Sequence, residues 1–351
     1  MEDVYVRLAA HLDKTPGGFP PTDSGIELRI LKRLFTEKEA ELALCLIMMP
    51  EPVEAIAQRA KESAPEIEGI LQKMAEKGLC LHIQKDGVNT YMLLQFVVGI
   101  WEYQVNRLTP ELIEEFNEYV PHLMATMESQ KTQQLRVVPV EKSIGVELNI
   151  MDHERLENLI RSQSKILVAP CICRREHAMV GKGCGKMEEA CLVFGGGAYI
   201  YESRGIGRTI TQDEALKIVR KGVEQGLVAQ PSNSVKPVNI CLCCDCCCQV
   251  LSNIKKTKAP AKIVNSNYQA RINEEACTAC AACESICPMD AIDMDQTAQI
   301  KKDRCIGCGL CVTVCEFEAV ALAEKQDQKR WEPPATLVDT YMKIAREKGL
   351  F

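Results

Sequence analysis

Eight cysteines in the last third of the chain have a spacing that suits iron–sulfur chemistry. A four-cysteine motif recurs 28 residues later: Cys277, Cys280, Cys283 and Cys287, then Cys305, Cys308, Cys311 and Cys315. Each copy reads C-x2-C-x2-C-x3-C, and Pro288 follows the first. A cubane cluster needs four thiolates, of which a tight C-x2-C-x2-C loop supplies three. The two motifs therefore predict two four-iron clusters.

This pattern resembles that of bacterial two-cluster 4Fe-4S ferredoxins. The resemblance implies that the last cysteine of each motif crosses to the other cluster. One cluster then has Cys277, Cys280, Cys283 and Cys315 as ligands, and the other has Cys305, Cys308, Cys311 and Cys287. Glu316 stands where proline is common in such proteins, which removes no ligand. Two zinc sites are the alternative, but zinc motifs normally pair two C-x2-C elements.

Ten more cysteines lie in the middle of the chain, more than a structural role requires. They are Cys171, Cys173, Cys184, Cys191, Cys241, Cys243, Cys244, Cys246, Cys247 and Cys248. Residues i and i+2 of an extended strand face the same side, so the pairs 171/173 and 241/243 are each expected to bind one site. Adjacent cysteines face opposite sides, which would divide the run 243–248 between two centres or leave spare thiols.

We interpret these ten cysteines as ligands of one or two further iron–sulfur clusters, because metal sites draw on clustered thiolates. The first expected set is Cys171, Cys173, Cys184 and Cys191, and the run 241–248 supplies the rest. Zinc sites are one alternative. A dithiol/disulfide redox centre is another, since vicinal thiols attack disulfides when their pKa is lowered.

Basic residues accompany the middle cysteines. Arg174, Arg175 and Lys182 could neutralise a thiolate-rich cluster or form a solvated basic face. His177 could be a ligand, although a structural histidine is favoured. Residues 170–248 resemble the central part of uncharacterised ferredoxin-domain proteins of anaerobes, with their C-x-C-R and C-x-C-C-x-C-C-C elements. That resemblance implies iron–sulfur chemistry without a defined reaction.

The order of predicted elements indicates an α+β, multidomain protein. The expected parts are a winged-helix-like domain (1–100), a helical connector (101–135), a Cys-rich α/β module (136–260), a two-cluster ferredoxin-like domain (261–325) and a tail (326–351). Within the Cys-rich module we expect strands at 137–140 and 166–169 and a helix from Gln212 to Gln225. Residues 259–261 look like a linker.

The winged-helix resemblance covers roughly residues 25–98. It depends on several short helices followed by a hairpin, 79–83 with 89–94. DNA binding needs a basic surface, whereas the candidate reading helix begins with Glu66 and Glu68. DNA is therefore not an expected partner. A role in protein docking is favoured, and the domain could also form a homo-oligomer.

Composition limits the class of protein. The 351 residues are 46% hydrophobic and 26% charged, as in ordinary globular proteins, but include 20 cysteines. Net charge is −6, divided into −10 over residues 1–160 and +4 over the remainder. No apolar run reaches the ~20 residues of a membrane helix, and the acidic start has no signal stretch. We expect a cytoplasmic protein whose thiols bind metal.

These observations predict an iron–sulfur electron-transfer protein of an anaerobic or low-oxygen cell, which passes single electrons between a redox partner and a second Cys-rich centre. Because the chain shows no dinucleotide or flavin motif, the expected partner is a flavin- or metal-containing oxidoreductase. One alternative is a redox-sensing winged-helix transcriptional regulator. Another is a reductase with an active cluster or dithiol in the middle module.

Overall fold

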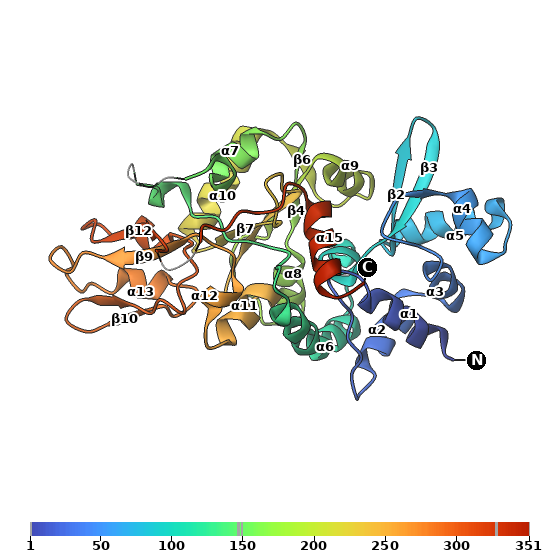
Figure 1. Ribbon diagram of the computed structural model, residues 1–351, viewed down its shortest axis with the longest axis horizontal. Coiled ribbons are helices and arrows are strands. Elements are labelled where there is room, and N and C mark those ends of the chain that lie inside the picture. Colours follow the sequence, from blue (N-terminus) through green and yellow to red (C-terminus); the bar gives the residue numbers. More distant parts are fainter. Residues whose placement is uncertain (1, 146–147, 149, 327–328, 351) are drawn as a thin grey trace. The chain divides into compact units, whose positions relative to one another are not determined.

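The computed structural model describes all residues except 1, 146–147, 149, 327–328 and 351 (Figure 1). The chain divides into two compact units, residues 1–130 with 344–351, and residues 131–343. Helices and strands are mixed in each, in agreement with the predicted α+β content. The predicted domain boundaries are finer than this division and stay predictions. Within the described part of the chain, no helix is both long enough and apolar enough to cross a membrane.

The first unit combines helices with a small antiparallel sheet of order β1-β3-β2. Its elements are α1 (Val4–Asp13), α2 (Ile26–Leu34), α3 (Glu37–Ala43), β1 (Glu51–Pro52), α4 (Val53–Ala60), α5 (Ala64–Glu76), β2 (Cys80–Lys85), β3 (Val88–Leu93) and α6 (Pro110–Ser129). A capping box between Thr36 and Glu39 starts α3. The predicted hairpin is confirmed as β2 and β3.

The second unit contains a five-stranded antiparallel sheet of order β6-β4-β5-β8-β7. Its elements are α7 (Leu156–Arg161), β4 (Ile166–Pro170), α8 (Ile172–Met179), β5 (Glu189–Phe194), α9 (Gly195–Ser203), β6 (Arg208–Ile210), α10 (Gln212–Glu224), β7 (Val228–Pro231), β8 (Asn239–Cys243) and α11 (Gln249–Lys256). The helix predicted from Gln212 is confirmed as α10, which the Thr211 side chain caps. The strand predicted at 166–169 is confirmed as β4.

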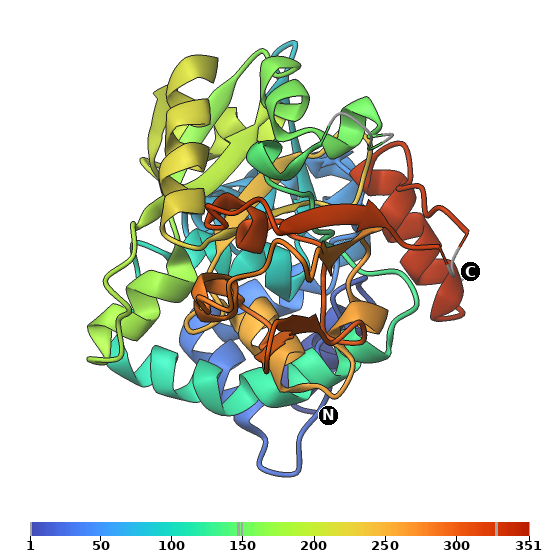
Figure 2. The ribbon, with the colours of Figure 1, turned by 90° about the vertical axis from the view of Figure 1, so that its left-hand side faces the viewer.

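Alternation along the strands gives this sheet two different faces. On β8, Leu242 packs into the core that α7 and α10 cover, and both helices lie over that face in Figures 1 and 2. Its neighbours Cys241 and Cys243 pack into a second core instead. That second core also contains residues of the C-terminal module, so the sheet and the module share one hydrophobic core.

The strand predicted at 137–140 is wrong, although the segment is extended. Its N–H groups bond in several directions rather than to one neighbouring strand. Val138 donates to the carbonyl oxygen of Ala229 on β7, while Val140 donates to that of Cys308 in the C-terminal module. The segment therefore connects the sheet to the module.

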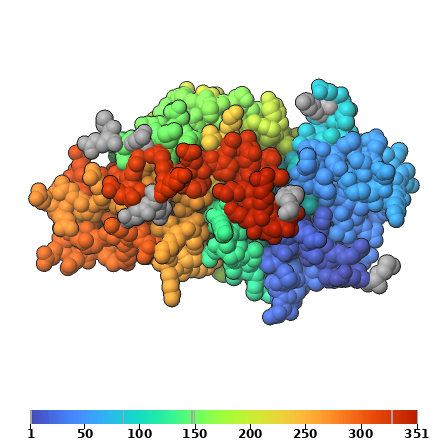
Figure 3. All heavy atoms as spheres, viewed as in Figure 1, coloured from blue at the N-terminus to red at the C-terminus, as the bar shows by residue number. Residues whose placement is uncertain are grey.

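The C-terminal module (residues 261–325) is built from two similar halves. Its elements are α12 (Pro260–Ile263), β9 (Tyr268–Ile272), α13 (Ala282–Ile286), β10 (Ile292–Met294), β11 (Ala298–Ile300), α14 (Leu310–Thr313) and β12 (Val320–Glu324), and a further helix, α15 (Leu337–Glu347), follows. Pro260, within the linker predicted at 259–261, begins α12, and the linker itself stays a prediction. β9 pairs with β12, and β10 pairs with β11. Figure 3 shows the orange atoms of this module gathered in one compact body.

The internal repeat extends to the backbone. Positive φ angles occur at Ala279, Ala281 and Asp290 in the first half, and again 28 residues later at Gly307, Gly309 and Glu318. A left-handed conformation strains any residue with a Cβ. Position 279 is exposed, so an alanine side chain meets little steric hindrance there. At Gly307 no space is left, because a Cβ would lie 2.2 Å from the carbonyl oxygen of Tyr268.

Replacing this glycine should therefore cost more than conformational strain alone. We expect Gly307→Ala to lower the free energy of unfolding by more than about 2 kcal/mol. The control is Gly205→Ala, since Gly205 also has a positive φ but no atom within 4 Å of the position that a Cβ would take. That change should cost about 1 kcal/mol. Anaerobic urea unfolding measures both, and equal losses would contradict the steric explanation.

Candidate metal centres

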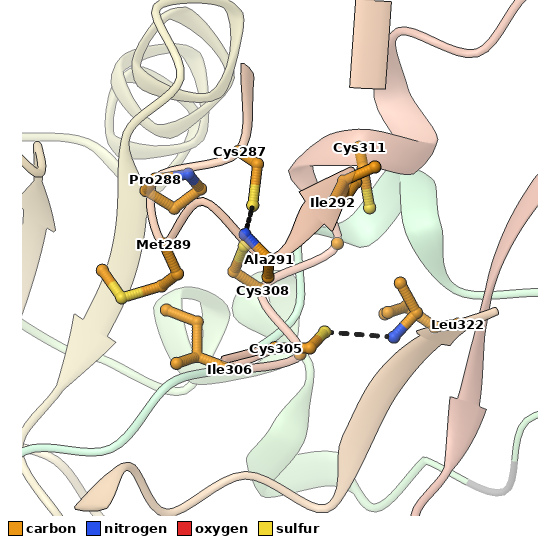
Figure 4. Close-up of a pocket in the computed structure, with 13 residues that line it drawn as sticks. Cys287, Pro288, Met289, Ala291, Ile292, Cys305, Ile306, Cys308, Cys311 and Leu322 are labelled. Atoms are coloured by element: carbon orange, nitrogen blue, oxygen red, sulfur yellow. Dashed lines mark hydrogen bonds between the residues drawn. The ribbon is translucent and has the colours of Figure 1, made fainter. Parts of the chain in front are cut away.

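Four cysteines of the C-terminal module surround one cavity, which we call the buried set: Cys287, Cys305, Cys308 and Cys311. Figure 4 shows these four cysteines around the cavity, together with apolar side chains such as Ile292 and Ile306. Three of the cysteines come from the second motif, and Cys287 is the last cysteine of the first. The cavity thus brings together the ligand combination that the ferredoxin resemblance implies.

Backbone N–H groups point at the sulfurs of this module. Ala270 donates to Cys305 Sγ at 3.3 Å, and Ala291 donates to Cys287 Sγ at 3.3 Å. Burial raises the pKa of Cys308 to about 12, although the N–H of Leu310 acts in the opposite direction. Such thiols become thiolates only when a cation replaces their protons, so cluster assembly here releases protons. The residues fit a four-iron cluster in donor type, number and surrounding N–H groups.

The other four cysteines of the module, which the ferredoxin resemblance assigns to one cluster, are called the exposed set: Cys277, Cys280, Cys283 and Cys315. Cys280 is exposed, Cys277 and Cys315 are partly buried, and Cys283 is buried. Ala298 donates its N–H to Cys277 Sγ at 3.4 Å. Phe317, two residues beyond Cys315, is 49% exposed. The two sets therefore differ in their access to solvent, even though their motifs are alike.

In the middle of the chain, four cysteines form the four-thiol group: Cys184, Cys244, Cys246 and Cys247. Their Sγ atoms all lie within 4.8 Å of one another. Cys184 comes from the loop between α8 and β5, and the others come from the loop between β8 and α11. Partial burial acts to raise the pKa of Cys184, but the Lys186 backbone N–H and the neighbouring thiols lower it to about 7.

The remaining six middle cysteines are linked by hydrogen bonds between thiols and form the six-thiol group. The order of contacts is Cys171, Cys173, Cys248, Cys243, Cys241 and Cys191. Cys173 is hydrogen-bonded to both of its neighbours in this order, and so is Cys243. These bonds hold the pKa of Cys241 and Cys248 well below its usual range.

Antiparallel pairing explains how this group assembles. β4 and β8 both end where β5 begins, because each is antiparallel to β5. Cys191 on β5 lies directly opposite Cys241 on β8. Cys171 follows the end of β4 as the N-cap of α8, and Cys248 is the N-cap of α11. The thiols at these strand ends and helix N-termini therefore lie together at one edge of the sheet.

The grouping differs from the one predicted from sequence. The sequence places Cys184 with Cys171, Cys173 and Cys191, but it lies with the cysteines of the 244–247 loop. Cys171 and Cys173 do share a group, yet the predicted reason is wrong, because Cys173 lies in the first turn of α8 rather than in a strand. The strand expected for the 241/243 pair is confirmed as part of β8. The run 243–248 is also divided between two groups, as predicted.

Arg174 is buried next to both groups and is 4% exposed. Its Nη2 donates to the Leu242 carbonyl oxygen, whereas Nε and Nη1 have no hydrogen-bond partner among the described residues. Burial acts to lower the pKa of Arg174, but nearby thiols raise it. The contributing thiols are Cys171 and Cys243 of the six-thiol group and Cys184 and Cys244 of the four-thiol group. Of the two predicted roles for Arg174, the buried position excludes a solvated face.

Other predicted neighbours have different positions. Arg175 forms an ion pair with Glu188. His177 Nδ1 lies 2.8 Å from the Cys173 carbonyl oxygen, which agrees with the structural role favoured for it. The same ring nitrogen lies 3.5 Å from a carboxylate oxygen of Glu176, whose side chain is fully buried.

Several further residues lie near the thiols, at positions that the cysteine motifs do not indicate. Asn239 donates its side-chain N–H to Cys241 Sγ at 3.5 Å, and their i, i+2 spacing on one strand could have revealed this contact. Lys255 bridges Asp245, within the cysteine run, and Asp290, three residues after Cys287. No sequence pattern signals this second contact, because it joins segments far apart in the chain.

The C-terminal module has the characteristics of an iron–sulfur domain with two clusters: a duplicated half, two four-cysteine sets and N–H donors to sulfur. Residues 276–319 match the 4Fe-4S dicluster domain family. This match supports iron–sulfur cluster binding and a role in electron transfer. No curated protein and no solved structure shows significant similarity to the chain.

The difference in exposure predicts an order of cluster loss. We expect an anaerobic iron chelator to remove the cluster of the exposed set first, because Cys280 is open to solvent while Cys308 is buried. The iron of the C-terminal module, followed by absorbance, should be released in two phases of about four atoms each. Cys280→Ser should abolish the fast phase, and Cys287→Ser the slow one. A single phase in the wild type would contradict the prediction.

The four-thiol group predicts a pH-dependent reactivity. Only the thiolate is a nucleophile, so alkylation rises as the pH passes through the pKa. After a chelator has stripped this group, Cys184 should react with iodoacetamide half-maximally near pH 7. Burial raises the pKa of Cys246 to about 11, so the alkylation of Cys246 should increase only at much higher pH. Peptide mass spectrometry measures both, and equal midpoints would refute the assigned contacts.

Proposed function

We propose that this chain is an iron–sulfur electron-transfer protein that passes single electrons between a redox partner and a second, Cys-rich centre formed by the middle cysteines. The observation that carries the proposal is the shared core of the second unit. Cys243 and Cys248 of the six-thiol group pack in the same hydrophobic cluster as Cys305 and Cys308 of the buried set. A thiol-rich centre that shares this core is the proposed acceptor for electrons that reach the buried cluster.

The exposed set is the proposed point of exchange with the partner. Cys280 is open to solvent, and the exposed aromatic ring of Phe317 lies in the same half as Cys315. The order would be partner, exposed cluster, buried cluster and middle centre, or the reverse. The partner is proposed to be a flavin- or metal-containing oxidoreductase, because the chain itself carries no hydride-accepting motif. The proposed setting is the cytoplasm of an anaerobic or low-oxygen cell.

The first unit is proposed to dock a protein partner or a second copy of the chain. Its helices and the β2–β3 hairpin follow the order expected of a winged-helix domain. The acidic residues of α5 argue against a DNA-binding role: Glu66 and Glu68 point to Ser63 and Asn89, with which they form hydrogen bonds. The regulator alternative predicts salt-dependent DNA binding. Such binding requires a basic surface, which the acidic start of α5 does not supply.

The reductase alternative has one observation in its favour. The six-thiol group contains thiols with lowered pKa values, which is a property of reactive cysteines. A reductase would need an open coordination position or a reactive pair. Trapping a mixed disulfide or a substrate-dependent change in the spectrum of the middle centre would favour this alternative over simple electron transfer.

The experiment that tests the proposal is an anaerobic count of iron and sulfide, combined with electron paramagnetic resonance after dithionite reduction. We expect at least about eight iron atoms per chain and the broadened spectrum of two reduced clusters that lie close together. A titration at controlled potentials should be reversible in one-electron steps. Fewer than eight iron atoms in fully loaded protein, or clusters that dithionite cannot reduce, would refute the proposal.

A further inference from the structure

The middle cysteines form two groups with different geometries, and each geometry suits a different occupant. In the four-thiol group the sulfurs are drawn together, all within 4.8 Å of one another. Four thiolates at the Zn–S distance of about 2.3 Å around one ion are about 3.8 Å apart. In a cubane each thiolate binds a different iron atom, so the thiolate sulfurs lie farther apart than around a single ion. The four-thiol group therefore has the dimensions of a single-ion site.

The topology of this group also suits a structural ion. Cys244, Cys246 and Cys247 follow one another in a single loop, and Cys184 closes the site from another. Four protein ligands leave no position open for substrate, as in structural zinc sites. Cys244 and Cys247 pack in the core under α7 and α10, so an ion here would fasten two loops to that core.

The six-thiol group has a different geometry. Its members are joined in a chain of pairwise contacts from Cys171 to Cys191, rather than gathered around one point. A single tetrahedral ion uses four thiolates at most, so all six can act as ligands only of a centre with several metal atoms. N–H donors from Asn239 and Leu251 reach Cys241 and Cys248, like the N–H donors to sulfur in the C-terminal module.

Arg174 provides independent evidence for negative charge at both groups. A buried cation without paired charge is costly, and this guanidinium keeps two N–H-bearing nitrogens without partners among the described residues. The groups that face it are thiols of both sets. Neutral thiols or disulfides could not compensate its charge, whereas thiolates can, and a bound metal keeps several thiolates ionised together in a buried site. This arrangement argues against a dithiol/disulfide centre.

We propose that the four-thiol group holds one tetrahedral zinc ion and that the six-thiol group holds a polynuclear iron–sulfur cluster, with Arg174 as the counter-charge between them. The zinc ion is structural. The iron–sulfur cluster is the electron-accepting centre, a role that rests on the proposed function: it gains one electron when the reduced buried cluster loses one. The Lys255 bridge between Asp245 and Asp290 holds the cysteine run against the C-terminal module.

Metal counts on full-length protein purified anaerobically test this division. The wild type should contain about one zinc ion and at least about twelve iron atoms. Cys246→Ser should lose the zinc and keep the iron. Cys191→Ser should lose about four or more iron atoms while keeping the zinc and the eight of the C-terminal module. Cys45→Ser is the matched control, since this thiol lies outside both groups, and it should change neither count.

Several results would overturn the division. If Cys246→Ser and Cys191→Ser remove the same metal, the ten thiols form one centre. If the wild type holds only about eight iron atoms, all reducible by dithionite, the six-thiol group carries no cluster, although the proposed function of the C-terminal module survives. X-ray absorption at the zinc edge needs no variant. Four sulfur neighbours at about 2.3 Å are expected, and nitrogen or oxygen neighbours would refute the assignment.

Arg174 has its own readout. Arg174→Gln should leave the ferredoxin-type clusters at their wild-type potentials and make the middle cluster harder to reduce, because reduction adds negative charge next to the lost cation. Arg174→Lys should restore most of the shift. If Arg174→Gln retains all its metal and all its potentials are unchanged, the counter-charge role is wrong.

Discussion

The antiparallel pairing of β5 with β4 and β8 is the constraint on which the second unit depends. It brings the ends of two strands and the start of a third to the same edge of one sheet, where Cys191 and Cys241 are direct neighbours. A shift of one residue in this register would turn Cys241 and Cys243 towards α7 and α10 and move Leu242 out of that core. Hydrophobic burial on one face therefore fixes the position of the thiols on the other.

Concentrated thiolates impose a second requirement, because negative charge in a protein interior needs compensation. The chain meets it in two ways. Backbone and side-chain N–H groups, such as those of Ala270, Ala291 and Asn239, point at individual sulfurs. Arg174 supplies a full positive charge where the two middle groups adjoin.

The two halves of the C-terminal module differ more in environment than in sequence. Both loops use positive φ angles at equivalent positions, but the first has Ala279 where the second needs Gly307. The reason is packing, because the second loop is pressed against β9 while the first is open to solvent. A duplicated motif thus places its cysteines in two environments of different exposure, on which the proposed direction of the electron path rests.

Cysteine spacing is a local property and a cubane accepts few alternatives, so the sequence alone predicts the iron–sulfur chemistry of the C-terminal module. It also identified β4, α10 and the hairpin, whose periodicity and caps are local. The partition of the middle cysteines was decided by tertiary structure alone. Cys184 lies far along the chain from Cys244, and only the pairing of β5 with β4 and β8 brings their loops together. The burial of Arg174 also depends on tertiary structure, because this third residue of α8 is buried by packing that the helix sequence alone does not indicate.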